Sequence, residues 1–484
     1  MKDIYLRAEQ VIGWFGEDLD AAAEAFRFMQ ALHEKMSKVT VNLEESISFI
    51  PEDLARGTSV LIDLADDVSG WLAVQKMFNK TWLSRVWRIQ EAVLAKQLLI
   101  QWGSEAMPWR IIEEVVHSAE RMTPIATKLY GSSTSIARDL THSLRIVRNE
   151  TKISLPSLLG QASGHQSTDP RDRIYALLGL IKNTSFFGIT PKYDISVQVL
   201  FRQAAAAMLV ESKDLFILSK FQRSLDSRLA GIPSWVPDWT KGCVRMYERG
   251  FPDWYHFKAD GRSQAEFNWH ADPNLLTIRG KIDDTINDDR VFFDPKFVEM
   301  DLGFGDSWGS AILDSFRDIA DFLDECTSLV PKDQLSPMSF WRALIGGLKE
   351  NGKLADDQYC QHCEDYEKYV KLARKAASQL EMSECVEEWA AERKAGVMTY
   401  SRAILHAGNQ RQFTLMDGVR PGWVPSWVKS GDKVAVLPGS RLPVIFRPCE
   451  NGQWIWVSNC SIETIILGEA MDDDRYPTQN ITLR

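Results

Sequence analysis

The sequence is poor in several features that would assign it to a particular class of protein. Its 484 residues include seven cysteines scattered along the chain, which predicts reduced thiols rather than a disulfide framework. No apolar run reaches the length of a membrane-spanning helix, and the first residues, MKDIYLRAEQ, lack the pattern of a signal peptide. We therefore expect a cytoplasmic protein that does not contact a membrane.

Positive charge is also scarce. Lys and Arg total 56 against 66 Asp and Glu, giving a formal net charge of −10. An acidic chain without a basic tract binds phosphate backbones poorly, so we expect no nucleic-acid partner. Common catalytic motifs are missing too: there is no Gly-rich phosphate loop, no G-x-S-x-G elbow and no H-E-x-x-H. The composition that remains, 45% hydrophobic and 25% charged, is that of an ordinary globular protein with room for several domains.

The stretch TWLSRVWRIQEAVLA, residues 81–95, has the spacing of an amphipathic helix. At about 100° per residue its apolar side chains form one broad arc, and Arg88 lies on the opposite, solvent-facing side. Gln90 projects from the middle of the arc, where its amide needs buried partners. Glu91 lies at the edge of the arc, one turn after Trp87, where a carboxylate could line a pocket and do chemistry. The alternative is a surface ion pair between Glu91 and Arg88.

A second motif, TDPRDRIYALLGL, occupies residues 168–180. Asp169 is a suitable N-cap with Pro170 as the first helical residue, so we predict a helix that starts there and ends at the motif's glycine. Arg171 and Asp172 are expected to form a structural ion pair inside the domain. We favour this structural interpretation of the motif over a catalytic one.

These motifs, in this order, resemble the fungal heterokaryon incompatibility (HET) domain family. That family has an R-x-W-x-x-Q-E helix and a D-P-R-D-x-x-Y-A-L-L-G-L signature. The residues that carry the resemblance are Arg85, Trp87, Gln90 and Glu91 in the first motif and Asp169, Pro170, Arg171, Asp172 and Tyr175 in the second. The segments DIYLRAEQVIGWFGE (3–17) and IPSWVPDW (232–239) are also similar to segments of the family.

The resemblance implies a fold and a chemistry. HET domains are regarded as distant relatives of TIR domains, which are flavodoxin-like α/β folds, and in NAD-cleaving TIR enzymes a W-x-x-x-E helix carries the catalytic glutamate. Trp87 and Glu91 have that spacing, which implies Glu91 as the catalytic residue, with Trp87 and Gln90 in the substrate pocket. NAD would then be a substrate, and no cofactor or metal is expected. Family members usually begin further upstream, so we expect an N-terminally truncated domain, either natural or the result of a start codon chosen too far downstream.

The pattern divides the chain into four regions of α+β character overall. We predict a partial, TIR-like α/β core at 1–110, a helical remainder with the DPRD motif at 111–240, a variable helical and β region at 241–400, and a β-rich region at 401–484. The last region resembles the tail common on HET proteins and is expected to form a small β-barrel, with a hairpin at Asn451–Gly452.

Several elements are predicted within these regions. Strands are expected at 11–15, 97–103, 215–218 and 275–286, helices at 19–36, 54–78, 197–209, 309–326 and 354–400, and a loop at 160–168. The 354–400 segment could form a helical hairpin or a face that binds a partner. Its C-x-x-C at 360–363 could ligate zinc, although a structural site needs four ligands.

The resemblance implies a protein of fungal nonself recognition and programmed cell death, with protein partners that are other incompatibility proteins or further copies of the chain. Three mechanisms stay open. The chain could cleave NAD with Glu91, act as a non-catalytic signalling scaffold, or be an inactive, truncated regulator of longer relatives. We favour a signalling role in the family's process.

Overall fold

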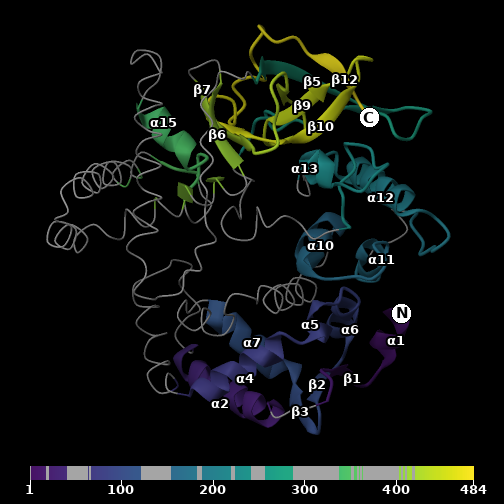
Figure 1. Cartoon of the computed structure of the whole chain (residues 1–484), viewed down its shortest axis with the longest axis vertical. Helices are drawn as coiled ribbons and strands as arrows, with labels where there is room; N and C mark the ends of the chain where they lie inside the picture. Colours follow the sequence, from purple (N-terminus) through teal and green to yellow (C-terminus); the bar gives the residue numbers. More distant parts are fainter. Residues whose placement is uncertain are drawn as a thin grey trace, which may run out of the picture. The chain divides into compact units, whose positions relative to one another are not determined.

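The computed structural model describes residues 2–17, 21–40, 64, 67–120, 154–181, 188–219, 224–240, 257–286, 337–349, 354–356, 359, 362, 400, 403–404, 407–408, 411–416 and 420–484. The chain forms two compact units (Figure 1). The N-terminal unit comprises Met1–Ala204 and Trp239–Gly242, and the C-terminal unit comprises Ala205–Asp238 and Cys243–Arg484. Both helices and sheets are present, as predicted. Among the described residues no helix has both the length and the apolar character needed to cross a bilayer.

A small mixed sheet lies in the N-terminal unit. Its strands, in spatial order, are β1 (Val11–Trp14), β2 (Leu98–Trp102) and β3 (Glu105–Pro108). β1 and β2 run parallel and β3 is antiparallel to β2, so the two strands predicted from the sequence are confirmed and pair directly. The helices of this part are α2 (Ala22–Thr40), α4 (Val68–Phe78) and α7 (Trp109–Glu120). α2 packs against both α4 and α7.

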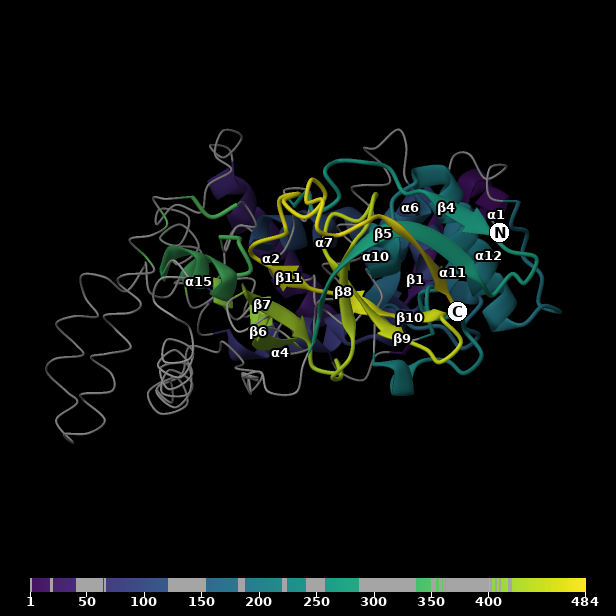
Figure 2. The same cartoon turned by 90° about the horizontal axis from the view of Figure 1, so that it is seen from above.

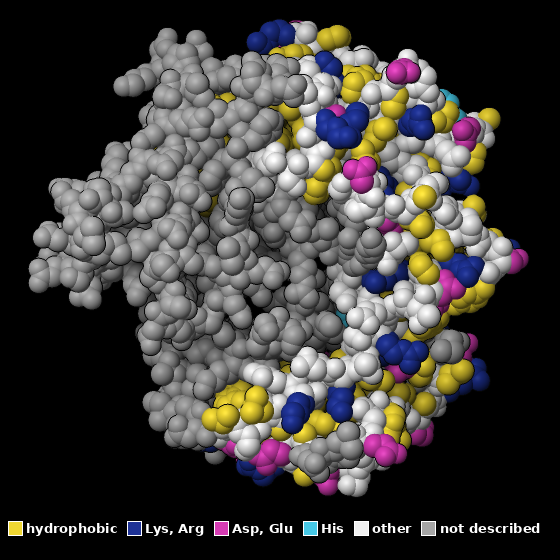
Figure 3. Space-filling view, viewed as in Figure 1, with side chains coloured by type: hydrophobic (Ala, Val, Ile, Leu, Met, Phe, Trp, Pro, Cys, Tyr) yellow, Lys and Arg dark blue, Asp and Glu magenta, His cyan; other side chains and the backbone are white. Residues whose placement is uncertain are grey.

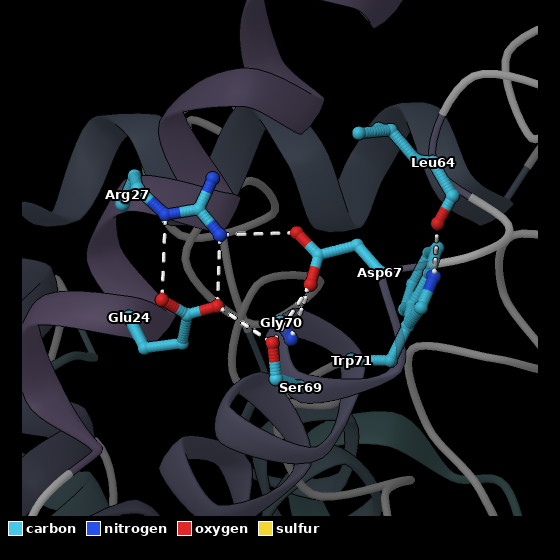
Figure 4. A network of polar contacts seen from close by, with 7 residues as sticks. All are labelled: Glu24, Arg27, Leu64, Asp67, Ser69, Gly70 and Trp71. Atoms are coloured by element: carbon cyan, nitrogen blue, oxygen red, sulfur yellow. Dashed lines mark hydrogen bonds and ion pairs between the residues drawn. The ribbon is translucent and has the colours of Figure 1, made fainter.

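The start of α4 is tied to α2 by a polar network (Figure 4). Asp67 is the N-cap of α4, and its carboxylate accepts a hydrogen bond from the Gly70 amide at 2.9 Å. Arg27 on α2 binds both Asp67, at 3.0 Å, and Glu24, at 2.8 Å. Gly70 permits the close approach of the two helices, because a Cβ there would lie 2.2 Å from the Phe28 ring.

The stretch predicted as one helix, 81–95, is broken in two. α5 (Thr81–Ser84) ends at Arg85, whose ψ of 136° is extended, and α6 (Arg88–Leu94) follows. The Val86 amide donates to the Gln166 carbonyl at 2.9 Å, and the Gln166 amide donates to the Ser84 carbonyl. The prediction of a continuous helix was wrong because a β-bridge to a distant segment takes the backbone groups that the helix would have used.

The polar segment predicted as a loop, 160–168, is partly helical. α10 (Leu155–Gln161) runs into its first residues, and the 3₁₀ turn η1 (Ala162–Gly164) follows directly. The second motif forms α11 (Asp172–Leu178), which ends where the motif's glycine was expected to end it but begins later than Pro170.

Two predictions after this motif have different outcomes. The helix expected at 197–209 is confirmed as α12 (Val197–Ser212). The strand expected at 215–218 is wrong, since this segment is the helical turn α13 (Phe216–Ser219). The Leu215 amide, just before this turn, donates a hydrogen bond to the Gly439 carbonyl at 2.7 Å. Apolar content alone did not distinguish a short strand from a buried turn.

The C-terminal unit is built on a six-stranded sheet. Its strands, in spatial order, are β12 (Gln479–Leu483), β10 (Trp454–Asn459), β9 (Val444–Pro448), β8 (Lys433–Val436), β5 (Leu276–Thr285) and β4 (Phe267–Trp269). β12 pairs parallel with β10 and antiparallel with β5, so the pairings run in a ring from β5 through β8, β9, β10 and β12. Strands β5, β8, β9 and β10 of this sheet can be followed in Figure 2. The predicted hairpin is confirmed: Gly452, with φ of 76°, lies in the turn between β9 and β10.

A second sheet and the helix α15 also lie in this unit. The sheet has the order β11 (Ser461–Ile462), β7 (Arg420–Pro425) and β6 (Arg411–Met416), and α15 (Pro337–Leu344) packs on β7. Side chains of both sheets share one apolar core, which includes Val424, Val434, Ile445 and Val457. The predicted helix 309–326 and nearly all of 354–400, including Cys360 and Cys363, lie outside the described residues.

Candidate functional site

Glu91 is held by two uncharged donors. Its Oε1 accepts a hydrogen bond from the Tyr5 hydroxyl at 3.3 Å, and its Oε2 accepts one from the Trp82 indole N–H at 3.1 Å. Tyr5 comes from the helix α1 (Lys2–Arg7), Trp82 from α5 and Glu91 from α6. Three short elements therefore meet at this half-buried carboxylate.

The alternative of a surface ion pair depended on a solvent-facing Arg88. The structure contradicts that placement: Arg88 is 1% exposed, and its Nε donates to the Arg85 carbonyl at 3.3 Å. The break between α5 and α6 explains the error, because it changes the helical phase at the start of α6. Glu91 is thus oriented by Tyr5 and Trp82, and neither residue was assigned to the site from sequence.

The Trp82 ring is fixed on several sides. Its centroid lies 5.7 Å from that of Phe15 and 6.3 Å from that of Trp109, and the Arg88 guanidinium lies 5.4 Å from it. Gly13 of β1 is equally close, because a Cβ at that position would lie 3.0 Å from the ring. These contacts fix the direction of the indole N–H, and with it the position of Glu91 Oε2, which accepts its hydrogen bond.

Tyr5 remains a hydrogen-bond donor over the physiological range. Burial, followed by the negative charge of Glu91 and the hydrogen bond to it, raises the pKa of the Tyr5 phenol to about 12. The hydroxyl is therefore protonated at neutral pH and donates to the carboxylate. Tyr5 precedes Glu91 by 86 positions, so no spacing rule links the two residues in the sequence.

Gln90 points away from Glu91, into the contact between α6 and α11. It is 2% exposed, and its Nε2 donates to the Ala176 carbonyl at 2.8 Å. A Cβ on Gly179 would lie 2.5 Å from that nitrogen, so the glycine after α11 makes room for the amide. Trp87 is half-buried at the start of α6, and its carbonyl accepts from the Gln90 and Glu91 amides. A pocket role for Trp87 and Gln90 stays a prediction.

The second motif makes contacts different from those expected. Arg171 binds Asp169, not Asp172, with its Nη2 at 2.7 Å from the carboxylate. The Arg171 guanidinium lowers the pKa of Asp169. Asp172 accepts instead from the Tyr193 hydroxyl at 2.6 Å. The predicted Arg171–Asp172 pair was wrong because Asp169 turns back on the motif and accepts from the Arg171 amide at 2.9 Å.

The motif also fastens a following segment to α11. The Tyr175 hydroxyl donates to the Lys192 carbonyl at 2.6 Å, and Arg171 donates to the Ile195 carbonyl at 2.9 Å. Pro170 contributes its carbonyl, which accepts from the Arg173 amide at 3.1 Å. These contacts join the motif to backbone carbonyls of its own unit.

His165 is a buried titratable residue that the sequence did not single out. It is fully buried, and within the described part of the chain neither ring nitrogen has a hydrogen-bond partner. Burial and then the positive charges of Arg88 and Arg173 hold the pKa of His165 well below its usual value, so the ring is neutral. Arg173 also donates to the Ser163 carbonyl at 3.1 Å, which closes the turn around the histidine.

Metal ligation finds no support where the structure is described: no group of three or more His, Cys, Asp and Glu side chains there is suited to a metal ion. Figure 3 shows positive and negative side chains interspersed over the described part of one face of the molecule.

Comparison with known proteins identifies the class. Residues 1–91 match the family model "Heterokaryon incompatibility protein (HET)". The chain is also 22% identical over 536 aligned residues to "Heterokaryon incompatibility protein 6, OR allele" of Neurospora crassa, an alignment that covers 93% of this chain and 74% of that protein. The chain is therefore similar to heterokaryon incompatibility (HET) proteins, over residues 1–91 by the family model and along most of its length by the alignment. No solved structure matches it.

Proposed function

We propose that this chain acts in heterokaryon incompatibility, as a protein of fungal nonself recognition whose activation leads to programmed cell death. The family match supports the proposal, and so does the similarity to an incompatibility protein along nearly the whole chain. The matched residues 1–91 include Tyr5, Trp82 and Glu91, so the whole carboxylate site lies within the segment that matches the family model. Its partners are other incompatibility proteins or further copies of the chain, and it works in the cytoplasm.

The proposal includes an architecture for each unit. A TIR-like, flavodoxin-like arrangement of the N-terminal unit is supported by the parallel pair β1 and β2, since strands joined in parallel need a long crossover between them, here one that contains α2 and α4. A small barrel in the C-terminal unit is supported by the ring of strand pairings that returns from β12 to β5. We assign this second unit a structural or interaction role.

A second candidate function is NAD cleavage by Glu91, and one observation favours it. Among the described residues each carboxylate oxygen accepts one donor, and an ionised carboxylate has about four acceptor positions, so within this part of the structure each oxygen keeps a position for a substrate hydroxyl. A carboxylate fixed in this way could orient the hydroxyls of the nicotinamide ribose and stabilise an oxocarbenium-like transition state. NAD is the substrate here, and the reaction requires no cofactor.

Incompatibility is tested by introducing the full chain into Neurospora crassa and fusing those cells with a strain that lacks it. The expected result is death of the fused cells, scored by uptake of a vital dye. The Glu105→Ala variant is the matched control for the Glu91→Ala variant, since Glu105 is an exposed carboxylate of the same unit. Viable fusions at equal protein amounts would contradict the proposed role.

The chemistry is tested in the same cells by measuring NAD. The catalytic function predicts that NAD falls with the native chain and with Glu105→Ala but not with Glu91→Ala. Cell death without a fall in NAD would favour a scaffold that signals without catalysis. If neither occurs, the inactive-regulator alternative is favoured. Soluble amounts of the variants are matched by immunoblot, so that a loss of folding is not read as a loss of catalysis.

A further inference from the structure

The helix α1 is weakly anchored. None of its six side chains is buried, and two apolar ones point outward, Ile4 at 64% and Leu6 at 42% exposure. An isolated helix of this length is unstable in water, because nucleation is unfavourable and too few backbone bonds follow it. α1 therefore keeps its form only through the contacts that dock it.

The contact of α1 with α6 places Tyr5 on Glu91. The hydroxyl-to-carboxylate hydrogen bond is long, at 3.3 Å, and the ring is half-buried. Just after the helix, Glu9 forms an ion pair with Lys96 at 3.0 Å, but both side chains are more than half exposed, and such pairs contribute little. Among the described residues, detaching α1 thus gives up few polar interactions beyond the Tyr5 bond.

The other donor to Glu91 is anchored very differently. Trp82 packs against Phe15 and Trp109 and lies close to β1, so it stays in place if α1 leaves. Departure of α1 would therefore uncover Oε1 while Oε2 remains bonded. One donor to the carboxylate, Trp82, therefore stays in place, and the other, Tyr5, leaves with α1.

We propose that α1 is a removable strap, fastened by Tyr5, that covers the Glu91 carboxylate and releases it when the helix detaches. With the strap docked, the Tyr5 hydroxyl takes one of the two acceptor positions of Oε1. With the strap released, both positions of Oε1 are open to a hydroxyl-bearing substrate. The regulatory consequence rests on the proposed catalytic role of Glu91, whereas the strap itself is measurable without any substrate.

The experiment is carboxylate labelling of the full chain with a carbodiimide and glycine ethyl ester, read at Glu91 by peptide mass spectrometry. Tyr5→Phe removes the hydroxyl and keeps the ring, and we expect the rate of Glu91 labelling to rise about fivefold with the loss of one hydrogen bond. Leu6→Pro unwinds α1 while both partners remain, and it should raise labelling at least as much. Ile4→Ala is the matched control on the same helix and should leave labelling unchanged, because that side chain faces solvent.

Glu105, exposed on β3, reports reagent activity in every sample. A rise at Glu91 in both Tyr5→Phe and Leu6→Pro, with Glu105 constant, supports the strap. Unchanged Glu91 labelling in either variant overturns it. The two proposals fail separately: more labelling without any NAD cleavage would reject the catalytic role and keep the strap. Glu91-dependent NAD cleavage with unchanged labelling would keep the catalytic role and reject the strap.

Discussion

In the C-terminal unit the buried carboxylates Asp283 and Asp432 each bind an arginine, whereas in the N-terminal unit the half-buried Glu91 is bound by a phenol and an indole. Asp283 lies 2.6 Å from Arg420, and Asp432 lies 2.8 Å from Arg447. Both aspartate side chains are almost completely buried. Glu91, in contrast, is partly open to solvent and accepts only neutral donors among its described hydrogen bonds.

This difference separates structural charge from charge available for chemistry. An arginine beside a carboxylate cancels most of its field and fills its acceptor positions, so that the pair serves mainly to join two strands or turns. A phenol and an indole orient a carboxylate but leave its charge uncancelled, and that charge can stabilise a developing cation. If the proposed catalytic role holds, this difference places the chemistry in the N-terminal unit and leaves the C-terminal unit a supporting role.

The comparison is tested most strongly by removing one partner of a buried pair. Asp432→Ala leaves Arg447 without its bidentate acceptor and the Lys429 amide without its cap, and it should lower the free energy of unfolding by about 3 kcal/mol. Urea denaturation measures the change. Glu266→Ala, which breaks an exposed pair with Arg279, is the control and should cost less than about 0.5 kcal/mol. Equal effects would show that burial of the pair in the C-terminal unit is unimportant.

A smaller effect is expected where α6 meets α11. Gly179→Ala brings a Cβ within 2.5 Å of the Gln90 amide nitrogen and should cost about 2 kcal/mol in urea denaturation. Its φ of −64° suits any residue, so the cost is steric rather than conformational. In a Gln90→Ala background the obstacle is gone, and the same change should cost less than about 0.5 kcal/mol. Additive costs would refute the close contact between Gln90 and Gly179.

Elements with a local signal could be predicted from the sequence. β1 and β2 are apolar runs bounded by turns, α12 has helical spacing, and the Asn451–Gly452 pair marks a hairpin. The break at Arg85 could not be predicted, because its cause is the Gln166 carbonyl and amide, some 80 positions away. Periodicity records the apolar face of a segment and contains no information about a remote backbone partner.

In the candidate site, too, some residues could be found from local sequence and others depend on remote contacts. The position of Glu91 at the edge of an apolar arc singled it out, and the family resemblance gave it a role. Its partner Tyr5 lies on another helix, and Trp82 reaches it only because α5 and α6 are separate helices. The helical spacing of residues 81–95 places Trp82 on an ordinary apolar face and gives it no role at the site. Tertiary contacts, not local pattern, determine which neutral donors meet the carboxylate.

The smallest expected effect concerns His165, a buried group of the N-terminal unit on which only desolvation and the positive charges of Arg88 and Arg173 lower the pKa. Its folded pKa lies below the ordinary value of 6.5, so below that pH the unfolded chain binds a proton that the folded chain does not. Stability must therefore fall as the pH falls. Between about pH 7.5 and about pH 5.5 this one group should cost about 1 kcal/mol.

The measurement is urea denaturation of the native chain and of His165→Phe at both pH values. Phenylalanine keeps an aromatic ring in the buried position and does not titrate, so the variant should lose about 1 kcal/mol less than the native chain on acidification. Other groups contribute alike to both proteins and cancel in the difference. Equal losses would mean that the buried imidazole binds its proton in the folded state as readily as in the unfolded one. In that case the N-terminal unit would stabilise the protonated His165 ring, as the C-terminal unit stabilises its buried carboxylates. The contrast between the two units would then apply only to Glu91.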